Sequence, residues 1–215
     1  MSYKVYLSPS NQSNNKYAAG NTNEKEQCTA IADAAQRALE RCGIDVLRGD
    51  RFSMEGRVSH SNAWGADLYV PIHTNAFNGT VSGTRLFYYN AGGEGWKACN
   101  AIMNRLAPIT PGDSDNVTPY PDLYEIRFPT APAAYCECEF HDVPNVATWI
   151  IHHTEDIGEM IAAGICDYFG VEYKTEGVLY CVQVGAFAER ANAEKRLRAV
   201  KLDYPDAFIW TKEVN

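Results

Sequence analysis

The sequence predicts an α/β protein: a three-layer sandwich with a largely parallel central sheet flanked by helices, followed by a small C-terminal βαβ unit. Two observations carry this prediction. Apolar stretches typical of strands alternate with amphipathic stretches typical of helices between residues 3 and 170, and this alternation is typical of a mainly parallel sheet. The stretch "ADLYVPIH" at 66–73 is mostly apolar, as expected of a strand buried on both faces.

The elements of the main unit, residues 1–170, follow from the hydrophobic spacing in chain order. Ile31, Ala35 and Leu39 form an apolar stripe that predicts the first helix, and Gly43 ends that helix. The expected strands are 3–8, 44–49, 66–73, 84–90 and 133–140, and the expected helices are 24–42, 54–65, 94–107 and 154–170.

Two further segments lie outside these elements. Residues 108–122 are polar and rich in Pro and Gly, and because loops of this length are often functional, we expect the segment to face a substrate. After a linker at 171–177, the tail contains an expected strand at 178–187, a helix at 189–204 and a strand at 206–213. A βαβ unit this small exposes too much apolar surface to be stable alone. We therefore expect it to pack on the main unit or on another copy of itself.

The composition is that of an ordinary globular protein and excludes some classes of function. Of 215 residues, 46% are hydrophobic and 21% are charged. The formal net charge of -8 argues against a nucleic-acid-binding protein, because no basic tract offsets it. The first residues lack the pattern of a secretory signal, and no apolar run approaches the length of a membrane span.

The cysteines indicate a reducing compartment. There are seven, an odd number, and none forms a CxxC pair. The one close pair is Cys136 and Cys138, and because residues two apart on a strand share a face, we expect both thiols in the core. A redox or metal-binding role for this pair is the alternative.

Polar residues at the strand ends are the candidates for chemistry, because ligands of such sheets bind beyond the carboxyl ends of the strands. His73 ends the strand 66–73, Glu24 opens the first long helix, and Glu137 interrupts an apolar strand. Each also has a structural interpretation. His73 is then a packed core residue, Glu24 belongs to a helix cap, and Glu137 forms an ion pair, for example with Arg127.

A histidine and a glutamate with a second carboxylate nearby are typical of a zinc hydrolase. Zinc takes three protein ligands and keeps a water molecule in the open position. It lowers the pKa of that water and polarises a carbonyl group, while a glutamate that is not a ligand moves the proton. The residues by themselves thus indicate a metal-dependent hydrolase.

The order of the motifs from about residue 3 to residue 170 resembles the zinc-dependent N-acetylmuramoyl-L-alanine amidases of bacterial autolysins and phage endolysins. The motifs are the Glu24-Lys25 pair that starts the first helix, "ADLYVPIHTNA" with His73, Gly83-Thr84, and "PAAYCECEF" with Glu137. A Glu139 stands where the family has Gly. "RVSHSN" retains an Arg and an Asn of another family motif at a wider spacing, Arg57 and Asn62.

This resemblance implies hydrolysis of the amide between the lactyl group of N-acetylmuramic acid and the L-alanine of the stem peptide. It implies that Glu24 and His73 bind Zn²⁺, that Glu137 is the catalytic acid and base, and that peptidoglycan is the partner. The residues expected to contact substrate are Asn75, Tyr120, Tyr124 and Arg127.

The departure from the family is at the first metal ligand, where Asn11 replaces histidine. An amide oxygen is a weaker zinc donor than imidazole. Three alternatives follow: zinc is held through Asn11 or extra water at reduced affinity, His60 or His141 moves in, or zinc is lost and the domain only binds peptidoglycan. We favour activity, because Glu24 and His73 occur together with the catalytic glutamate. A peptidase acting on another peptide bond is a further class that the sequence leaves open.

The tail resembles the first half of the sporulation-related (SPOR) peptidoglycan-binding repeat. The signature is "VQVGAF" and the Asn192-Ala193-Glu194 helix start. Because the repeat normally has two βαβ halves, we expect two chains to pair their 178–215 segments in a homodimer; packing on the main unit is the alternative. We expect synthesis in the cytoplasm and action at the bacterial cell wall after release without a signal peptide of its own, as for a phage or prophage lysin.

Overall fold

The computed structural model describes residues 2–175, 177, 184–205, 207–209 and 211. The chain divides into two compact units, Met1–Glu176 and Gly177–Asn215. The first unit contains the α/β fold, and the second contains one helix among its described residues.

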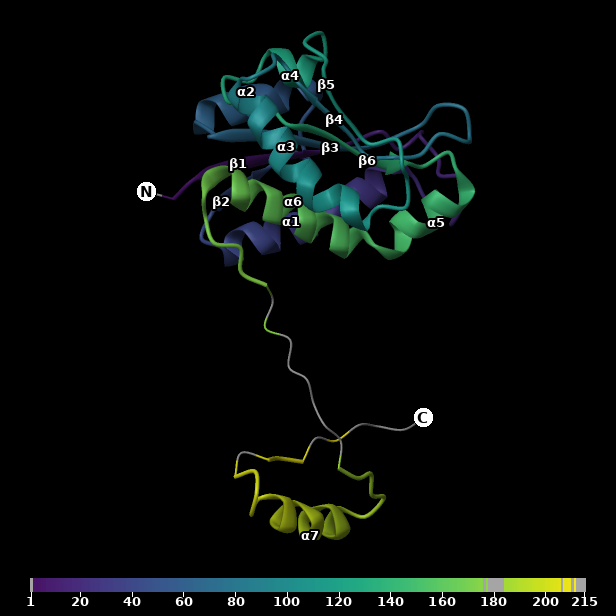
Figure 1. The fold of residues 1–215 in the computed structure, drawn as a ribbon, viewed down its shortest axis with the longest axis vertical. Helices are drawn as coiled ribbons and strands as arrows, with labels where there is room; N and C mark the ends of the chain where they lie inside the picture. The colour runs from purple at the N-terminus through teal and green to yellow at the C-terminus, as the bar shows by residue number, and fades with distance from the viewer. Residues whose placement is uncertain (1, 176, 178–183, 206, 210, 212–215) are drawn as a thin grey trace. The chain divides into compact units, whose positions relative to one another are not determined.

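A six-stranded sheet forms the centre of the first unit (Figure 1). The strands are β1 (Lys4–Pro9), β2 (Asp45–Arg48), β3 (Leu68–Asn75), β4 (Arg85–Tyr88), β5 (Asn116–Pro119) and β6 (Tyr135–Phe140). Their order is β2-β1-β3-β6-β4-β5. Only the β4–β6 pair is antiparallel. The predicted largely parallel sheet is therefore confirmed.

Helices cover both faces of this sheet. They are α1 (Glu24–Arg41), α2 (Met54–Trp64), α3 (Glu94–Leu106), α4 (Tyr124–Arg127), α5 (Pro144–His152) and α6 (Thr154–Phe169), with a 3₁₀ turn η1 at Ala107–Ile109. Helices α1 and α3 both pack on α6. Helices α2 and α4 contact each other and lie across the strands from α1 and α6 (Figure 1). This is the three-layer arrangement that the sequence predicts.

Alternation along the strands divides the interior into two cores. Val5 and Leu7 of β1 belong to the larger core, which includes residues of α1, α3 and α6. Tyr6 of the same strand belongs to the smaller core, together with Tyr69 of β3 and Tyr135 of β6. Since successive side chains of a strand point to opposite faces, residues in step with these tyrosines face the α2 and α4 side.

Close packing of α6 on α3 depends on a glycine. A Cβ atom on Gly164 would lie 2.4 Å from the Cα atom of Ile102, a distance at which one backbone must shift. The absence of a side chain at Gly164 therefore lets α6 pack directly against the backbone of α3.

The structure adds elements that the sequence does not predict. The expected loop at 108–122 contains the edge strand β5, and α4 and α5 fall in stretches with no predicted helix. The proline that ends β5, Pro119, is tolerated because an edge strand leaves one row of backbone groups unpaired.

The cysteines of the described residues are all free and buried: Cys28, Cys42, Cys99, Cys136, Cys138 and Cys166. Cys136 and Cys138 are fully buried, as predicted. Both belong to the larger core. The seventh, Cys181, lies outside the described residues.

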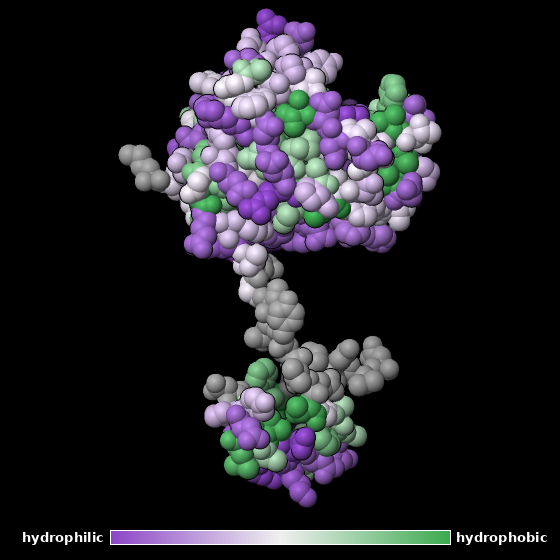
Figure 2. All heavy atoms as spheres, in the orientation of Figure 1, coloured by the Kyte–Doolittle hydropathy of each residue, from purple (hydrophilic) through white to green (hydrophobic). Residues whose placement is uncertain are grey.

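The second unit contains helix α7 (Arg190–Val200), within the expected 189–204 helix. The two flanking strands lie partly outside the described residues, since 178–183, 206, 210 and 212–215 are not described; residues 184–187 and 207–209 carry no strand. Leu202 and Phe208 of this unit are 85% and 69% exposed, and hydrophobic residues appear on its visible surface in Figure 2. In the part of the chain that is described, no helix is long and apolar enough to cross a membrane.

Candidate active site

Four side chains gather beside the carboxyl end of β3. We call Glu24, His73, Glu125 and Glu137 the His73 cluster. His73 and Glu137 are paired in register on the neighbouring parallel strands β3 and β6, so their side chains emerge next to each other on one face. Glu24 comes from the first turn of α1 and Glu125 from α4.

His73 and Glu24 form the closest contact in the cluster. The Nδ1 atom of His73 lies 2.8 Å from Oε1 of Glu24, and the two residues are only 6% and 1% exposed. Asn15 donates a hydrogen bond of 2.7 Å to Oε2 of the same carboxylate. Glu24 lies in the first turn of α1, where a carboxylate suits the helix dipole, but the side-chain cap is Asn23, which accepts from the Glu26 amide.

The turn after β1 brings an amide to this pair, and the amide belongs to Gln12. Its Nε2 atom lies 3.5 Å from Nδ1 of His73, and its Oε1 accepts a 2.9 Å hydrogen bond from Asn15. The oxygen and nitrogen of a glutamine amide are assigned from their hydrogen bonds. The bond from Asn15 assigns Oε1, so Nε2 faces the imidazole and the amide would have to turn to offer its oxygen there. Asn11 is exposed, and within the described residues its side chain makes no hydrogen bond to Glu24 or His73.

Glu125 is the member of the cluster that the sequence reasoning missed. Its Oε1 atom accepts hydrogen bonds from the hydroxyl groups of Ser8 at 2.5 Å and Tyr69 at 2.7 Å. Its Oε2 atom lies 3.8 Å from Nε2 of His73. The available signal was one carboxylate between apolar neighbours in "LYEIR", a pattern that also occurs on solvated turns.

The charged groups of the cluster shift one another's pKa towards the ionised forms of His73, Glu24 and Glu125. Burial alone would lower the pKa of His73, but its contacts with Glu125 and Glu24 outweigh burial and raise the pKa to about 9. Burial likewise works against ionisation of Glu24 and Glu125, yet hydrogen bonds hold the pKa of each carboxyl below its usual value. The two carboxylates thus favour the positively charged form of the His73 imidazole.

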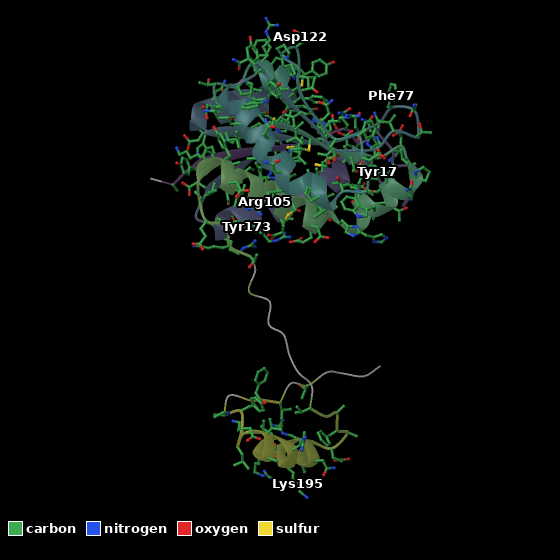
Figure 3. All side chains as sticks on the ribbon, in the orientation of Figure 1. Tyr17, Phe77, Arg105, Asp122, Tyr173 and Lys195 are labelled. Atoms are coloured by element: carbon green, nitrogen blue, oxygen red, sulfur yellow. The ribbon has the colours of Figure 1, made fainter. Side chains whose placement is uncertain are left out.

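Glu137 has a different environment. Burial raises its pKa to about 7, the positive charge of His73 lowers it, and the negative charge of Glu24 raises it. Its Oε2 atom is buried without a hydrogen-bond partner. The alternative ion pair with Arg127 is wrong, because Arg127 lies 3.7 Å from the exposed carboxylate of Asp122 instead; Asp122 is labelled in Figure 3.

The two other candidate histidines are held elsewhere. Nδ1 of His60 lies 3.1 Å from the Tyr6 hydroxyl. Nδ1 of His141 lies 3.0 Å from Oγ1 of Thr74, and the His141 ring stacks on Tyr17 at 4.9 Å, a residue labelled in Figure 3. Neither histidine makes a hydrogen bond to Glu24 or His73 in the described part of the chain.

The expected substrate residues lie outside the closest contacts of the cluster. Tyr120 is 47% exposed and packs edge-on against Phe87. Tyr124 packs on Phe128 with ring centroids 4.5 Å apart. Asn75 ends β3, and its side chain accepts from the Ala76 amide. The structure thus assembles Glu24, His73 and Glu137, but shows no contact between these three and the four expected substrate residues.

Arg57 fixes the turn that carries Gln12. Its guanidinium is 2% exposed and donates to the carbonyl oxygen of Pro9 at 2.7 Å and to Oγ of Ser8 at 3.2 Å. Charge-assisted bonds of this kind are stronger than bonds between neutral groups. The end of β1 is therefore held rigidly beside the cluster.

The donors in the cluster fit a divalent metal bound by two strong ligands and one weak ligand. No group of three or more His, Cys, Asp or Glu with a metal-binding arrangement occurs among the described residues. Glu24 and His73 nevertheless supply a carboxylate oxygen and an imidazole nitrogen 2.8 Å apart, which are zinc ligands. The Gln12 amide near the same nitrogen would supply a weaker oxygen donor if it turned its Oε1 away from Asn15.

One imidazole and three carboxylates beside the end of β3 provide the acid–base groups and metal donors of a hydrolytic site in an α/β protein. Residues 5–167 match the N-acetylmuramoyl-L-alanine amidase family, and the chain belongs to this family. Residues 176–215 match the SPOR domain.

Curated relatives and solved structures agree with this assignment. The sporulation-specific N-acetylmuramoyl-L-alanine amidase of Bacillus subtilis (strain 168) is 24% identical over 98% of this chain and 85% of its own length. The N-acetylmuramoyl-L-alanine amidase CwlM of Bacillus licheniformis is 26% identical over 96% and 84%. The catalytic domain of CwlV from Bacillus (Paenibacillus) polymyxa var. colistinus matches with a TM-score of 0.71 and 20% identity over 79% of this chain and 99% of that chain, which shows the shared fold.

The predicted family, fold and reaction class are therefore confirmed. The chain is a peptidoglycan hydrolase of the amidase type. The SPOR match adds a peptidoglycan-binding part at the C-terminus. The alternative of a non-catalytic wall-binding protein is not favoured.

Proposed function

We propose that this chain hydrolyses the amide between N-acetylmuramic acid and L-alanine with Zn²⁺ held by Glu24 and His73 and a third, weak amide donor from the turn at 11–12. The observation that carries the proposal is the approach of Nδ1 of His73 to Oε1 of Glu24 at 2.8 Å, beside the buried, unpartnered Oε2 atom of Glu137. An unpartnered buried carboxylate oxygen is costly, and it is explained when it faces a reacting water.

When bound, zinc supplies a polarised carbonyl and a more acidic water. The protein's own groups supply the proton transfers. Glu137 accepts a proton from the attacking water as the new C–O bond forms, and returns a proton to the leaving amine as the C–N bond breaks. A pKa of about 7 suits this exchange, because a general acid and base works best near the operating pH.

Substrate contact is proposed for Asn75 at the end of β3 and for Tyr120, Tyr124 and Arg127 beyond β5. Three features support these residues: the Tyr120 ring is exposed and the Tyr124 ring partly exposed, Arg127 is exposed, and Tyr120 lies in the expected substrate-facing segment with Tyr124 and Arg127 just after it. Arg127 suits a carboxylate of the stem peptide, because a guanidinium binds carboxylates in a fixed planar geometry.

Dye release from purified cell walls tests the enzyme. We expect lysis by the full-length protein, loss of lysis with a chelator, and recovery when zinc is added back. Glu137→Gln keeps the shape of the side chain and removes its proton transfer, so we expect lysis to fall by at least ~100-fold. Lysis that survives in this variant would contradict the mechanism.

Product analysis distinguishes the reaction from cleavage elsewhere in the stem peptide. An amidase releases stem peptides with a free amino-terminal L-alanine, whereas a peptidase on the same fold leaves that alanine attached to the lactyl group. Mass spectrometry of the digested walls separates these two results. Release of shortened stems without free alanine would overturn the proposed substrate bond.

We propose a homodimer formed through residues 178–215, each chain supplying one half of a peptidoglycan-binding repeat. The support is the exposed apolar surface of the second unit, which includes Leu202 at 85% and Phe208 at 69% exposure. A unit of this size buries too little surface to be stable alone. Mass in solution tests this: the full chain should be dimeric and a chain ending at 176 monomeric, and a dimeric truncated chain would contradict it.

We also propose that the protein acts at the bacterial cell wall. Its amidase and SPOR regions both point to peptidoglycan as the target. The expected route, cytoplasmic synthesis followed by release as for a phage or prophage lysin, stays a prediction.

A further inference from the structure

We propose that Glu125 is a positioning carboxylate for the metal-binding histidine: it accepts a hydrogen bond from the Nε2–H of His73, which keeps the proton on Nε2 and presents Nδ1 to the metal. This inference rests on the proposed zinc amidase. It concerns a residue that no sequence motif marks.

The two oxygen atoms of Glu125 have separate tasks. Oε1 accepts from both Ser8 and Tyr69, at 2.5 and 2.7 Å. Oε2 makes neither of these bonds and lies 3.8 Å from Nε2 of His73. Two hydroxyl donors therefore fix the carboxylate by one oxygen and leave the other directed at the imidazole.

The imidazole of His73 has one carboxylate at each nitrogen. Nδ1 lies 2.8 Å from Glu24, and Nε2, which is buried without a hydrogen-bond partner, faces Glu125. Tyr135 stacks on the ring at 4.7 Å with planes 20° apart, which limits rotation of the ring. Only a shift of Glu125 or a tilt of the ring is needed to close the 3.8 Å gap.

Metal binding makes the two nitrogens unequal. A histidine ligand gives one nitrogen to the metal and carries its single proton on the other, and a carboxylate that accepts that proton fixes the tautomer and makes the ligand more basic. Glu24, which shares the Nδ1 side with Gln12, is placed to bind metal with that nitrogen. Glu125 then accepts a hydrogen bond from the proton that stays on Nε2.

The position of Glu125 is maintained by groups that a merely space-filling residue would not need. It is 5% exposed, and an ionised carboxylate at such a site is costly unless it is hydrogen-bonded. Ser8 in turn accepts from Arg57 at 3.2 Å, so a buried positive charge stands behind the hydroxyl. The arrangement holds a negative charge at the back of the imidazole.

Zinc affinity and the His73 tautomer test this role. Full-length protein, Glu125→Gln and Glu125→Ala are freed of metal and titrated with zinc against a competing chelator. We expect about 10-fold weaker binding for Glu125→Gln, which keeps an acceptor but loses the charge, and up to about 100-fold for Glu125→Ala. In NMR spectra of the zinc-loaded wild type we expect a His73 Nε2 proton protected from exchange, and we expect its protection to be lost in Glu125→Ala.

One further variant and one control separate positioning from folding. Tyr69→Phe removes one of the two hydroxyl groups that hold Oε1, so its zinc affinity should lie between those of wild type and Glu125→Ala. Glu139→Gln neutralises another buried carboxylate, one bonded to backbone amides of Gly83 and Gly112, and should leave both readouts unchanged. Equal zinc affinity and equal Nε2 protection in wild type and both Glu125 variants would overturn the inference. A wild type that takes up no zinc would overturn the zinc amidase and the role of Glu125 together.

Discussion

The imidazole of His73 lies between two carboxylates, and a third carboxyl group beside it remains unpartnered. Glu24 and Glu125 are stabilised as anions by hydrogen bonds, whereas burial makes ionisation of Glu137 unfavourable. The same amino acid thus has two environments at this site, set by the donors around it. The glutamates with several donors lie against the histidine, and the glutamate without donors is the one we propose for proton exchange.

Glu137→Gln is expected to stabilise the metal-free protein at alkaline pH. The folded-state pKa of about 7 lies above the ordinary value of 4.5, so the native state resists ionisation. Its stability is greatest below pH 4.5 and falls as the pH rises towards 7. The neutral amide avoids this loss, and we expect the free energy of unfolding at pH 8 to rise by about 1–3 kcal/mol. Urea unfolding in the presence of a chelator measures it, and the difference should vanish near pH 4.

The neighbouring amides Asn11 and Gln12 differ in what they contact, and their substitution tells which one serves the metal. Both residues are exposed, but Gln12 approaches Nδ1 of His73 at 3.5 Å, whereas the Asn11 side chain makes no hydrogen bond to the cluster within the described residues. We expect Gln12→Ala to weaken zinc binding by about 10-fold and Gln12→His to strengthen it, because imidazole is the better zinc donor. Asn11→Ala is the matched control and should bind zinc as wild type does. The opposite ranking in a chelator competition would assign the third donor to Asn11.

At the scale of elements, one carboxylate joins the expected substrate-facing segment to the sheet. Glu139 accepts hydrogen bonds from the amides of Gly83 and Gly112 at 2.8 Å each and from that of Phe140 at 3.0 Å. Within the described part of the chain it forms no ion pair with a basic side chain. A Cβ on Gly112 would lie 2.1 Å from the Gly83 nitrogen, so the two backbone segments meet only because both residues are glycines.

Glu139→Ala is expected to release this junction. Buried amides without acceptors cost about 1–3 kcal/mol each, and water can replace part of the loss, so we expect the free energy of unfolding to fall by about 2–4 kcal/mol. Hydrogen exchange should accelerate at Gly83 and Gly112 before it does so in the core strands. Glu94→Ala is the control: Glu94 forms an exposed pair with Lys97, and its loss should change stability by less than ~0.5 kcal/mol. Unchanged exchange at the two glycines would contradict the anchor.

Hydrophobic periodicity predicts the long elements but not the short ones that complete the site. Strands β1, β3 and β6 and helices α1 and α6 carry enough apolar residues for their period to be read. Helix α4 has four residues, too few to show a period, so Glu125 could not be placed. Strand β5 is held by backbone pairing with β4. Backbone hydrogen bonds do not require particular side chains, so the sequence carries no clear pattern for this strand. The order of motifs also cannot tell which of two adjacent turn residues approaches His73. Here it is Gln12, whereas the motif order indicated Asn11.

At the scale of the whole molecule, the chain joins a unit with a complete core to a unit without one. The His73 cluster lies entirely within Met1–Glu176, whereas Gly177–Asn215 has one described helix, α7, with no buried residue. Amidase chemistry and wall attachment are therefore expected to separate along the chain. The SPOR match to residues 176–215 assigns attachment to the second unit.

Truncation after residue 176 is expected to preserve the reaction and weaken attachment to the wall. Hydrolysis of a soluble muropeptide by the truncated chain should match that of the full chain within about 2-fold, because every residue of the His73 cluster is retained. Retention on insoluble peptidoglycan should fall by about 10-fold or more, since a second binding module raises the effective concentration of the first. Co-sedimentation measures this with Glu137→Gln in both chains, so that the wall is not digested during the assay. If the two chains sediment equally, the second unit does not contribute to wall binding, whatever its oligomeric state.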